Sequence, residues 1–144
     1  MSQWRRFSTC CFVAVGCACL AFGCAERLPD PANELPFGFV DVPANGAAVA
    51  RVVRVAGWAL DDVRVARVDV YVNGRFRGST MASTPRPDVA NALAPYARQA
   101  QTSGWEVAVD LGEGSEPRTV LAQAVDDRGA TRDIGIVTLS VAGR

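Results

Sequence analysis

The chain has 144 residues, enough for one domain of about 100 residues behind a short leading segment. It contains no histidine, the commonest general base and metal ligand, which argues against most hydrolase designs and against a cofactor or metal held by imidazole. All 15 basic residues are arginine, and they are interspersed with 15 acidic residues. Nucleic-acid binding needs clustered cations, so no nucleic-acid partner is expected.

Residues 1–23 carry the pattern of an export signal. Arg5 and Arg6 precede an uncharged, largely apolar run over residues 7–25, and small residues stand near its end. A cationic start, an apolar middle and a small-residue cleavage site are the three parts of a secretory signal, so we predict that 1–23 is cleaved. An uncleaved membrane anchor is the alternative, because the run is close to the lower length limit for a membrane span.

Cys24 is the predicted modification site. The stretch Leu20-Ala21-Phe22-Gly23-Cys24 resembles a bacterial lipobox, which implies that Cys24 becomes the first mature residue and carries diacylglycerol. A competing match ends at Cys17 but leaves a shorter apolar region. Acyl chains hold a protein at a membrane by burying CH₂ groups. By the same resemblance, Ala25 favours the outer membrane or cell surface over the inner membrane.

No cysteine follows Cys24, so the domain lacks disulfides and depends on its apolar core. A metal or redox site among the leading cysteines is the less favoured interpretation, because neither histidine nor a second ligand pair accompanies them. Residues 24–37 are rich in proline and charge and are predicted to form a tether. The five cysteines are Cys10, Cys11, Cys17, Cys19 and Cys24.

Residues 38–144 are expected to form one β domain. Apolar and polar residues alternate in short runs separated by turn signals, which is typical of half-buried strands. Asn73-Gly74 supplies the two positive-φ positions of a type I′ hairpin turn. Six or seven such strands indicate two antiparallel sheets packed face to face. The main apolar runs are Ala66, Val68, Val70, Val72; Trp105, Val107, Val109, Leu111; Val120, Ala122, Ala124; and Val137, Leu139, Val141.

Residues 83–104 break this rhythm and are predicted to form a long loop with one short helical turn. Asp88 is the expected N-cap of that turn and Pro95 its stop. Long loops between strands carry binding sites, but they also accumulate neutral insertions, and the second interpretation is the commoner one. The residues at helical spacing are Val89, Leu93 and Tyr96.

Several motifs resemble bacterial Ig-like modules over about residues 38–142. They include an opening Pro-Ala-Asn-Gly turn at 43–46, Gly-Trp-Ala-Leu-Asp at 57–61, Val-Tyr-Val-Asn-Gly at 70–74 and Arg-Pro-Asp-Val at 86–89, with a late Asp-Asp-Arg-Gly turn at 126–129. The resemblance implies an all-β, immunoglobulin-like antiparallel sandwich of about seven strands. Such modules serve as spacers, adhesion units and accessories to carbohydrate-active enzymes, so the fold alone does not fix the function.

Two kinds of ligand site are weighed. For a glycan, Tyr71 is the best exposed aromatic candidate, whereas Trp58 is expected to pack between the sheets. For calcium, the acidic pairs at two turns are candidates, although such residues more often bond local backbone or pair with Arg86. The glycan-site candidates are Trp58, Tyr71, Arg86, Asp88 and Tyr96, and the calcium candidates are Asp61, Asp62, Asp126 and Asp127.

These observations favour a lipid-anchored module of the cell envelope with a structural or protein-interaction role. No catalysis and no cofactor are expected, because a lone small sandwich offers no cleft with facing acids. A carbohydrate-binding module and a calcium-stabilised adhesin are the alternatives. The expected partners are the membrane, through Cys24, and a protein or glycan of the envelope.

Overall fold

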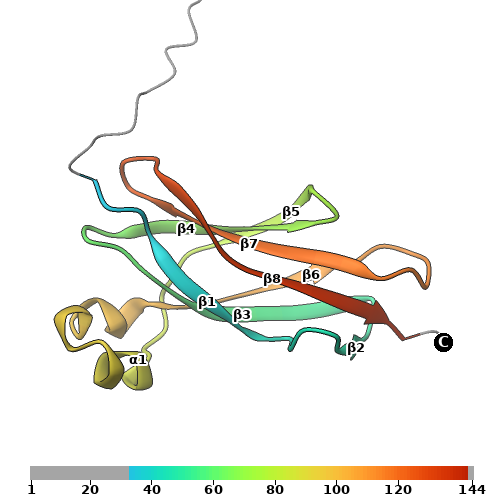
Figure 1. The fold of residues 1–144 in the computed structure, drawn as a ribbon, viewed down its shortest axis with the longest axis horizontal. Coiled ribbons are helices and arrows are strands. Elements are labelled where there is room, and N and C mark those ends of the chain that lie inside the picture. The colour runs from blue at the N-terminus through green and yellow to red at the C-terminus, as the bar shows by residue number, and fades with distance from the viewer. Residues whose placement is uncertain (1–32, 143–144) are drawn as a thin grey trace, which may run out of the picture.

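The computed structural model describes residues 33–142, which form two packed layers of strands (Figure 1). The three-stranded sheet has the order β1-β3-β6 and the five-stranded sheet the order β2-β8-β7-β4-β5. Neighbouring strands are antiparallel except for the short β2, which runs parallel to β8. The strands are β1 (Phe37–Val42), β2 (Ala48–Val49), β3 (Val52–Leu60), β4 (Val65–Val72), β5 (Arg75–Thr80), β6 (Gly104–Asp110), β7 (Arg118–Asp126) and β8 (Thr131–Val141).

The core lies between the two sheets and follows the predicted alternation. Val68, Val70 and Val72 of β4 are buried, and Trp105 of β6 is buried with them, as expected. Each strand therefore presents one face to the core and the other outward. The all-β sandwich predicted from the sequence is confirmed, with eight strands in the described part in place of about seven.

The β4–β5 connection is the predicted tight hairpin. Asn73 and Gly74 both have positive φ, at 49° and 75°. These angles match the twist of the flanking strands, which is why Asn-Gly is favoured at this turn. The hairpin aligns Tyr71 of β4 with Phe76 of β5.

The segment between β5 and β6 is more helical than the sequence predicted. It holds α1 (Pro87–Ala92) and two 3₁₀ helices, η1 (Ala94–Tyr96) and η2 (Gln99–Thr102), which together are called the helical excursion below. Asp88 is not the N-cap, which is Arg86; Asp88 lies in the first turn. Pro95 lies inside η1 and does not end the helical part, because proline fits the first turn of a new helix.

Trp58 does not pack between the sheets, and that expectation was wrong. On β3 the core-facing residues are Val53, Val55 and Ala59, so Trp58 has the opposite parity and faces outward. There it joins a second small core with Leu60 beneath the helical excursion. The excursion thus covers one end of the outer face of the three-stranded sheet.

The chain reaches β1 at the end of the sandwich that also holds the β7–β8 turn. The Asn33 side-chain amide donates to a carboxylate oxygen of Asp126, and the guanidinium of Arg128 donates to Asn33 Oδ1 at 3.2 Å. The C-terminal end of β8 lies at the opposite end of the domain (Figure 1). We call the Asn33 end the proximal end. Among residues 33–142, no helix is long and apolar enough to cross a membrane.

Candidate interaction face

An apolar row crosses the outer face of the five-stranded sheet. Tyr71 of β4 is in register with Leu121 of β7, and Leu121 is in register with Ile136 of β8. On the other side Tyr71 contacts Phe76 of β5 edge to face, with ring centroids 5.8 Å apart. We call these four residues the outer row: Phe76, Tyr71, Leu121 and Ile136.

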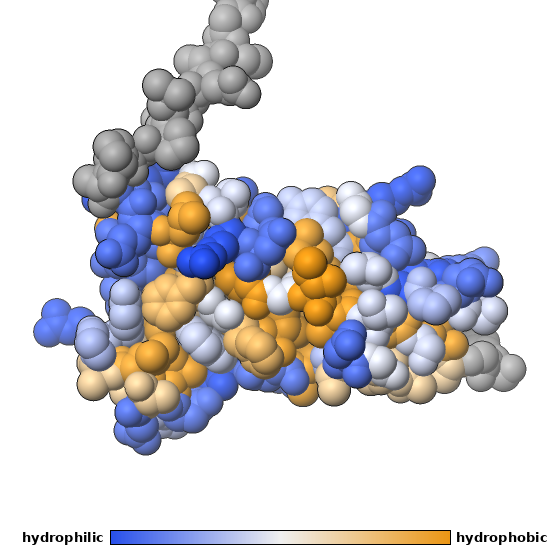
Figure 2. Space-filling model, viewed as in Figure 1, coloured by the Kyte–Doolittle hydropathy of each residue, from blue (hydrophilic) through white to orange (hydrophobic). Residues whose placement is uncertain are grey.

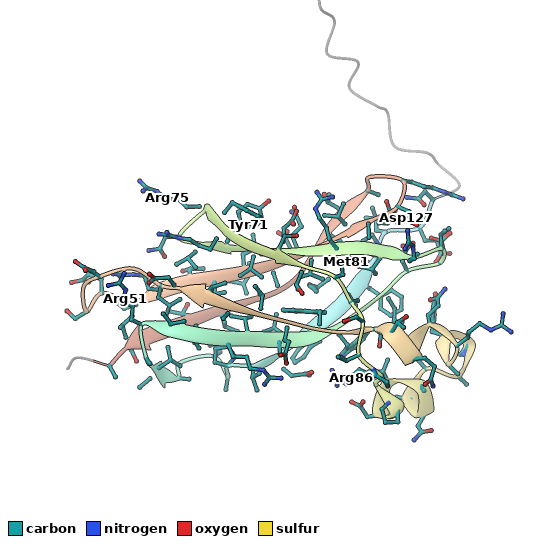
Figure 3. All side chains as sticks on the ribbon, turned by 180° about the vertical axis from the view of Figure 1, so that it is seen from behind. Arg51, Tyr71, Arg75, Met81, Arg86 and Asp127 are labelled. Carbon is teal, nitrogen blue, oxygen red and sulfur yellow. The ribbon has the colours of Figure 1, made fainter. Side chains whose placement is uncertain are left out.

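The two ends of the outer row are strongly exposed. Phe76 is 58% exposed and Ile136 is 61% exposed, whereas Tyr71 and Leu121 between them are half-buried. Figure 3 shows Tyr71 on the side of the large sheet that points away from the three-stranded sheet. A single exposed apolar residue is ordinary, but four in register on adjacent strands form a continuous patch, which is typical of an interaction site.

A polar row lies next to the outer row on the same face. Asp69 of β4 is in register with Ser79 of β5 and Gln123 of β7, and Gln123 is in register with Asp133 of β8. The Ser79 hydroxyl donates to Asp69 Oδ1 at 2.7 Å, and the Gln123 amide donates to Asp133 Oδ1 at 2.9 Å. These contacts fix the polar side chains in place. We call them the polar row: Ser79, Asp69, Gln123 and Asp133.

The three-stranded sheet also exposes apolar side chains, but they are not in one row. Phe39 of β1 is 58% exposed and Val52 of β3 is 60% exposed, with the ion pair of Arg54 and Glu106 on the same sheet between them. Figure 2 shows hydrophobic residues gathered where β1 and β8 lie in front. Charge interrupts this surface, so the outer row is the more continuous patch.

The predicted glycan residues lie in separate places. Trp58 and Tyr96 both contact Phe37, with ring centroids 6.0 Å and 5.1 Å from it, so both help to hold the helical excursion. Tyr71 lies on the other sheet, in the outer row. The structure therefore does not bring the three aromatic candidates onto one face.

Arg86 and Asp88 form part of an ionic clamp. Arg86 bonds to Asp88 and to Asp41 of β1, which ties the helical excursion to the sheet. The hydrogen bond from Arg86 lowers the pKa of Asp88 to about 2. Figure 3 shows Arg86 beside the helices, far from Tyr71 along the domain.

The acidic turn residues mostly bond local donors. Asp61 Oδ2 accepts hydrogen bonds from the backbone N–H groups of Val63 and Arg64, both at 3.0 Å. Asp126 accepts from turn N–H groups as well as from Asn33, and Asp127 pairs with Arg64. Within residues 33–142 no group of three or more acidic, histidine or cysteine side chains is placed to hold a metal ion. The calcium site stays a prediction.

Asp61 also lines a pocket of about 430 Å³ at the proximal end, together with Arg64, Met81 and Gln99. It is 1% exposed, and its Oδ1 has no hydrogen-bond partner among the described residues. Burial raises the pKa of Asp61, against the effect of its two backbone donors. The carboxyl shapes the β3–β4 turn, because both of its donors belong to that turn.

Sequence reasoning identified Tyr71 but missed Phe76, Leu121 and Ile136. A signal was available for Leu121 and Ile136, since each is apolar at an outward position between inward residues such as Val120 and Val137. The alignment of these strands, however, depends on pairings between distant segments.

Two packed sheets of mainly antiparallel strands are the architecture of the class of immunoglobulin-like modules. The family profile described as "Bacterial Ig domain" matches residues 36–120, and the chain belongs to that family. Among solved structures, it is similar to the fibronectin(III)-like modules of Clostridium thermocellum CbhA, with 17% identity and a TM-score of 0.47. That match covers 74% of this chain, which spans 45% of the matched chain. A search of curated proteins found no match.

Proposed function

We propose that the chain is a lipid-anchored module of the cell envelope that acts by binding a partner through the outer row, with no catalysis. The observation that carries the proposal is the row itself: Tyr71 and Leu121 at the centre, with Phe76 and Ile136 exposed at its ends. Aromatic and aliphatic anchors beside fixed polar groups are the composition of an interaction surface.

The anchor part of the proposal is supported by the leading sequence. Cys24 ends a lipobox-like stretch, and it lies outside the described residues together with the rest of the signal and most of the predicted tether. The Asn33 side chain is hydrogen-bonded to Asp126, so eight residues, or nine residue-to-residue steps, separate Cys24 from a fixed point on the domain. At about 3.3 Å per residue, the proximal end then stays within roughly 30 Å of the membrane.

This arrangement points the domain away from the lipid. The β4–β5 hairpin, with Asn73 at its tip, lies at the end opposite Asn33. Tyr71 is two residues from that tip, so the outer row is nearer to the distal end than to the membrane. A short tether and a distal binding row suit a module that meets other envelope components. The favoured location is the outer membrane or the cell surface.

Intact mass spectrometry tests the anchor. The full chain is expressed in a bacterial host beside a Cys24→Ser variant, and both products are weighed. We expect a mature mass that begins at Cys24 with added acyl chains, and its loss in the variant. An uncut product, or one cut elsewhere without acyl chains, contradicts the anchor.

Site-specific photo-crosslinking tests the binding role of the face. A photoreactive residue replaces Ile136 in the outer row or, as a matched control, Val52 on the other sheet; the two are 61% and 60% exposed. We expect discrete adducts in intact cells from position 136 and much weaker ones from position 52. Equal adduct patterns from both positions would count against the outer row.

A carbohydrate-binding module is the second candidate, favoured by the aromatic pair of half-buried Tyr71 and exposed Phe76 next to the polar row. Aromatic faces stack on sugar rings, while neighbouring amide and carboxylate groups bond hydroxyls. Tyr71→Ala would then abolish retention on an insoluble glycan without lowering Tm. Trp58→Ala is the comparison, because Trp58 packs beneath the helical excursion and its loss lowers stability instead.

A further inference from the structure

The outer row is self-complementary about one line, and the polar row brings no like charges together about the same line. That line runs parallel to the strands, between β4 and β7, the two central strands of the four that carry the rows. A two-fold rotation about it exchanges β4 with β7 and β5 with β8. In a face-to-face pair of copies, Tyr71 then meets Leu121 of the other copy, and Phe76 meets its Ile136. An aromatic side chain faces an aliphatic one at every position.

The same rotation keeps the carboxylates of the polar row apart. Ser79 of β5 comes opposite Asp133 of β8 in the other copy, and Asp69 of β4 comes opposite Gln123 of β7. Within each chain the Asp69 carboxylate accepts from Arg67 and Ser79, and Asp133 accepts from Gln123, so both carboxylates keep their partners in the pair. Neither carboxylate faces its own symmetry mate, so the polar row adds no like-charge repulsion.

The position of the N-terminal segment selects this axis. A two-fold axis along the strands leaves the proximal ends of both copies, each with its Asn33, at the same end of the pair. The other face-to-face axis, across the strands, would place the two Asn33 residues at opposite ends. Two chains anchored in one membrane can form only the first pair.

We propose that the outer face of the five-stranded sheet binds the same face of a second copy, giving a two-fold dimer that stands on one membrane. The proposal rests on the proposed function, since the anchor selects the axis and the outer row supplies the contact. The partner of the outer face is then another copy of this chain.

The contact is small, so the anchor matters to its strength. Four strands spaced about 4.8 Å apart give a face about 14 Å across. Such a face lies at or below the lower end of specific interfaces, which bury about 1,200–2,000 Å² in total. Confinement to one membrane raises the effective concentration of the chains and populates a weak dimer without any new contact.

Paired cysteines test the register. Full chains with Ser79→Cys and with Asp133→Cys are co-expressed, and membranes are treated with a short bis-maleimide that spans about one sheet spacing, roughly 10 Å. We expect a cross-linked dimer from the mixture, at least several-fold above the yield from either variant alone. Ser79 meets Asp133 across the interface at about one sheet spacing. Two Ser79 positions are offset by a further three strand spacings along the sheet, which puts them roughly 17 Å apart.

Two controls separate the register from chance contact. Ser79→Cys mixed with Ala108→Cys, an exposed position on the outer face of the other sheet, should give only background. The unmodified chain reports any reaction of its own cysteines. Equal yields from the Ser79/Asp133 and Ser79/Ala108 mixtures would overturn the dimer.

A third variant links the cross-link to the outer row. Ile136→Arg should abolish the cross-link between Ser79→Cys and Asp133→Cys while leaving Tm unchanged, because Ile136 is 61% exposed. A cross-link that survives Ile136→Arg would also overturn the proposed face.

The mass of the same samples reports acylation of Cys24 separately. If no acyl chain is present, the anchor fails, and the same mixture tests the face at high concentration in solution.

Discussion

The rings of Phe37 and Tyr96 meet edge to face, with centroids 5.1 Å apart and planes at 76°. This contact joins the first residue of β1 to the last residue of η1, the first of the two 3₁₀ helices, in a segment far along the chain. Trp58 also contacts Phe37, so the helical excursion is held by aromatic packing on the outer face of the small sheet.

Tyr96→Ala should therefore destabilise the domain by about 2 kcal/mol, less than for a fully buried aromatic residue because Tyr96 is half-buried. Tyr71→Ala is the matched control, since Tyr71 is also half-buried but packs on an exposed row. Urea unfolding of both variants gives the comparison. A Tyr71→Ala cost as large as that of Tyr96→Ala would show that the outer row is structural.

Asp88 gives a pH dependence. Arg86 lowers its folded-state pKa to about 2, below the usual value of about 3.9. A lowered carboxyl pKa means that the pair stabilises the fold above about pH 4 and loses this effect as the pH falls toward 2. Asp88→Asn should therefore lower Tm slightly at pH 7 and match the unmodified chain near pH 2. Asp62→Asn, which removes another exposed aspartate charge, is the control. A Tm difference that grows as the pH falls would contradict the pairing.

Asp61 should behave in the opposite way. Burial raises the pKa of the Asp61 carboxyl in the folded state above its value in the unfolded chain. Its contribution to the free energy of unfolding therefore falls as the pH rises through its unfolded-state pKa and then its folded-state pKa. Asp61→Asn keeps an oxygen for the N–H groups of Val63 and Arg64 and removes the buried charge, so at pH 7 it should match or exceed the unmodified chain in stability.

Asp61→Ala provides the contrast. It removes the acceptor of both turn N–H groups and should cost about 1–3 kcal/mol. Thermal unfolding at pH 7 compares the two variants. If the asparagine variant were as unstable as the alanine variant, the ionised carboxylate would be needed, and a bound cation would become the favoured explanation.

Gly135 of β8 packs against Val40 of β1, on the other sheet, with no room for a side chain. A Cβ at Gly135 would lie 2.6 Å from Val40 Cγ2 and 3.1 Å from Val40 Cβ. Gly135→Ala should thus overpack the core and cost about 1–3 kcal/mol. In a double-mutant cycle, the cost of Gly135→Ala should shrink in a Val40→Ala background, because the clashing methyl groups are gone. Additive costs would mean that the contact is not the cause.

Chelation tests the calcium-stabilised alternative. Asp61 and Asp126 already accept backbone hydrogen bonds and Asp127 pairs with Arg64, so a calcium ion would have to compete with these donors. We expect EDTA to leave Tm unchanged. A Tm that falls with EDTA and recovers with added calcium would instead support the adhesin, since a ligand that binds only the folded state stabilises it.

The sequence by itself determined the features that depend on neighbouring residues. Alternation placed Val68, Val70 and Val72 in the core, because successive side chains of a strand point to opposite faces. Asn73-Gly74 determined a hairpin, because that turn needs two residues with positive φ. Motif order was enough to identify the family that the profile then matched.

Tertiary structure decided what depends on pairing between distant strands. Tyr71 and Leu121 are 50 residues apart, and no local rule places β4 beside β7 in the register that aligns them. The prediction for Trp58 was wrong for a related reason. Where both faces of a strand are covered, apolar residues point both ways, and the sequence does not alternate between apolar and polar residues to show which face is the core. The outer row exists only once four strands are in register, since the alignment of side chains across a sheet is a property of the assembled sheet.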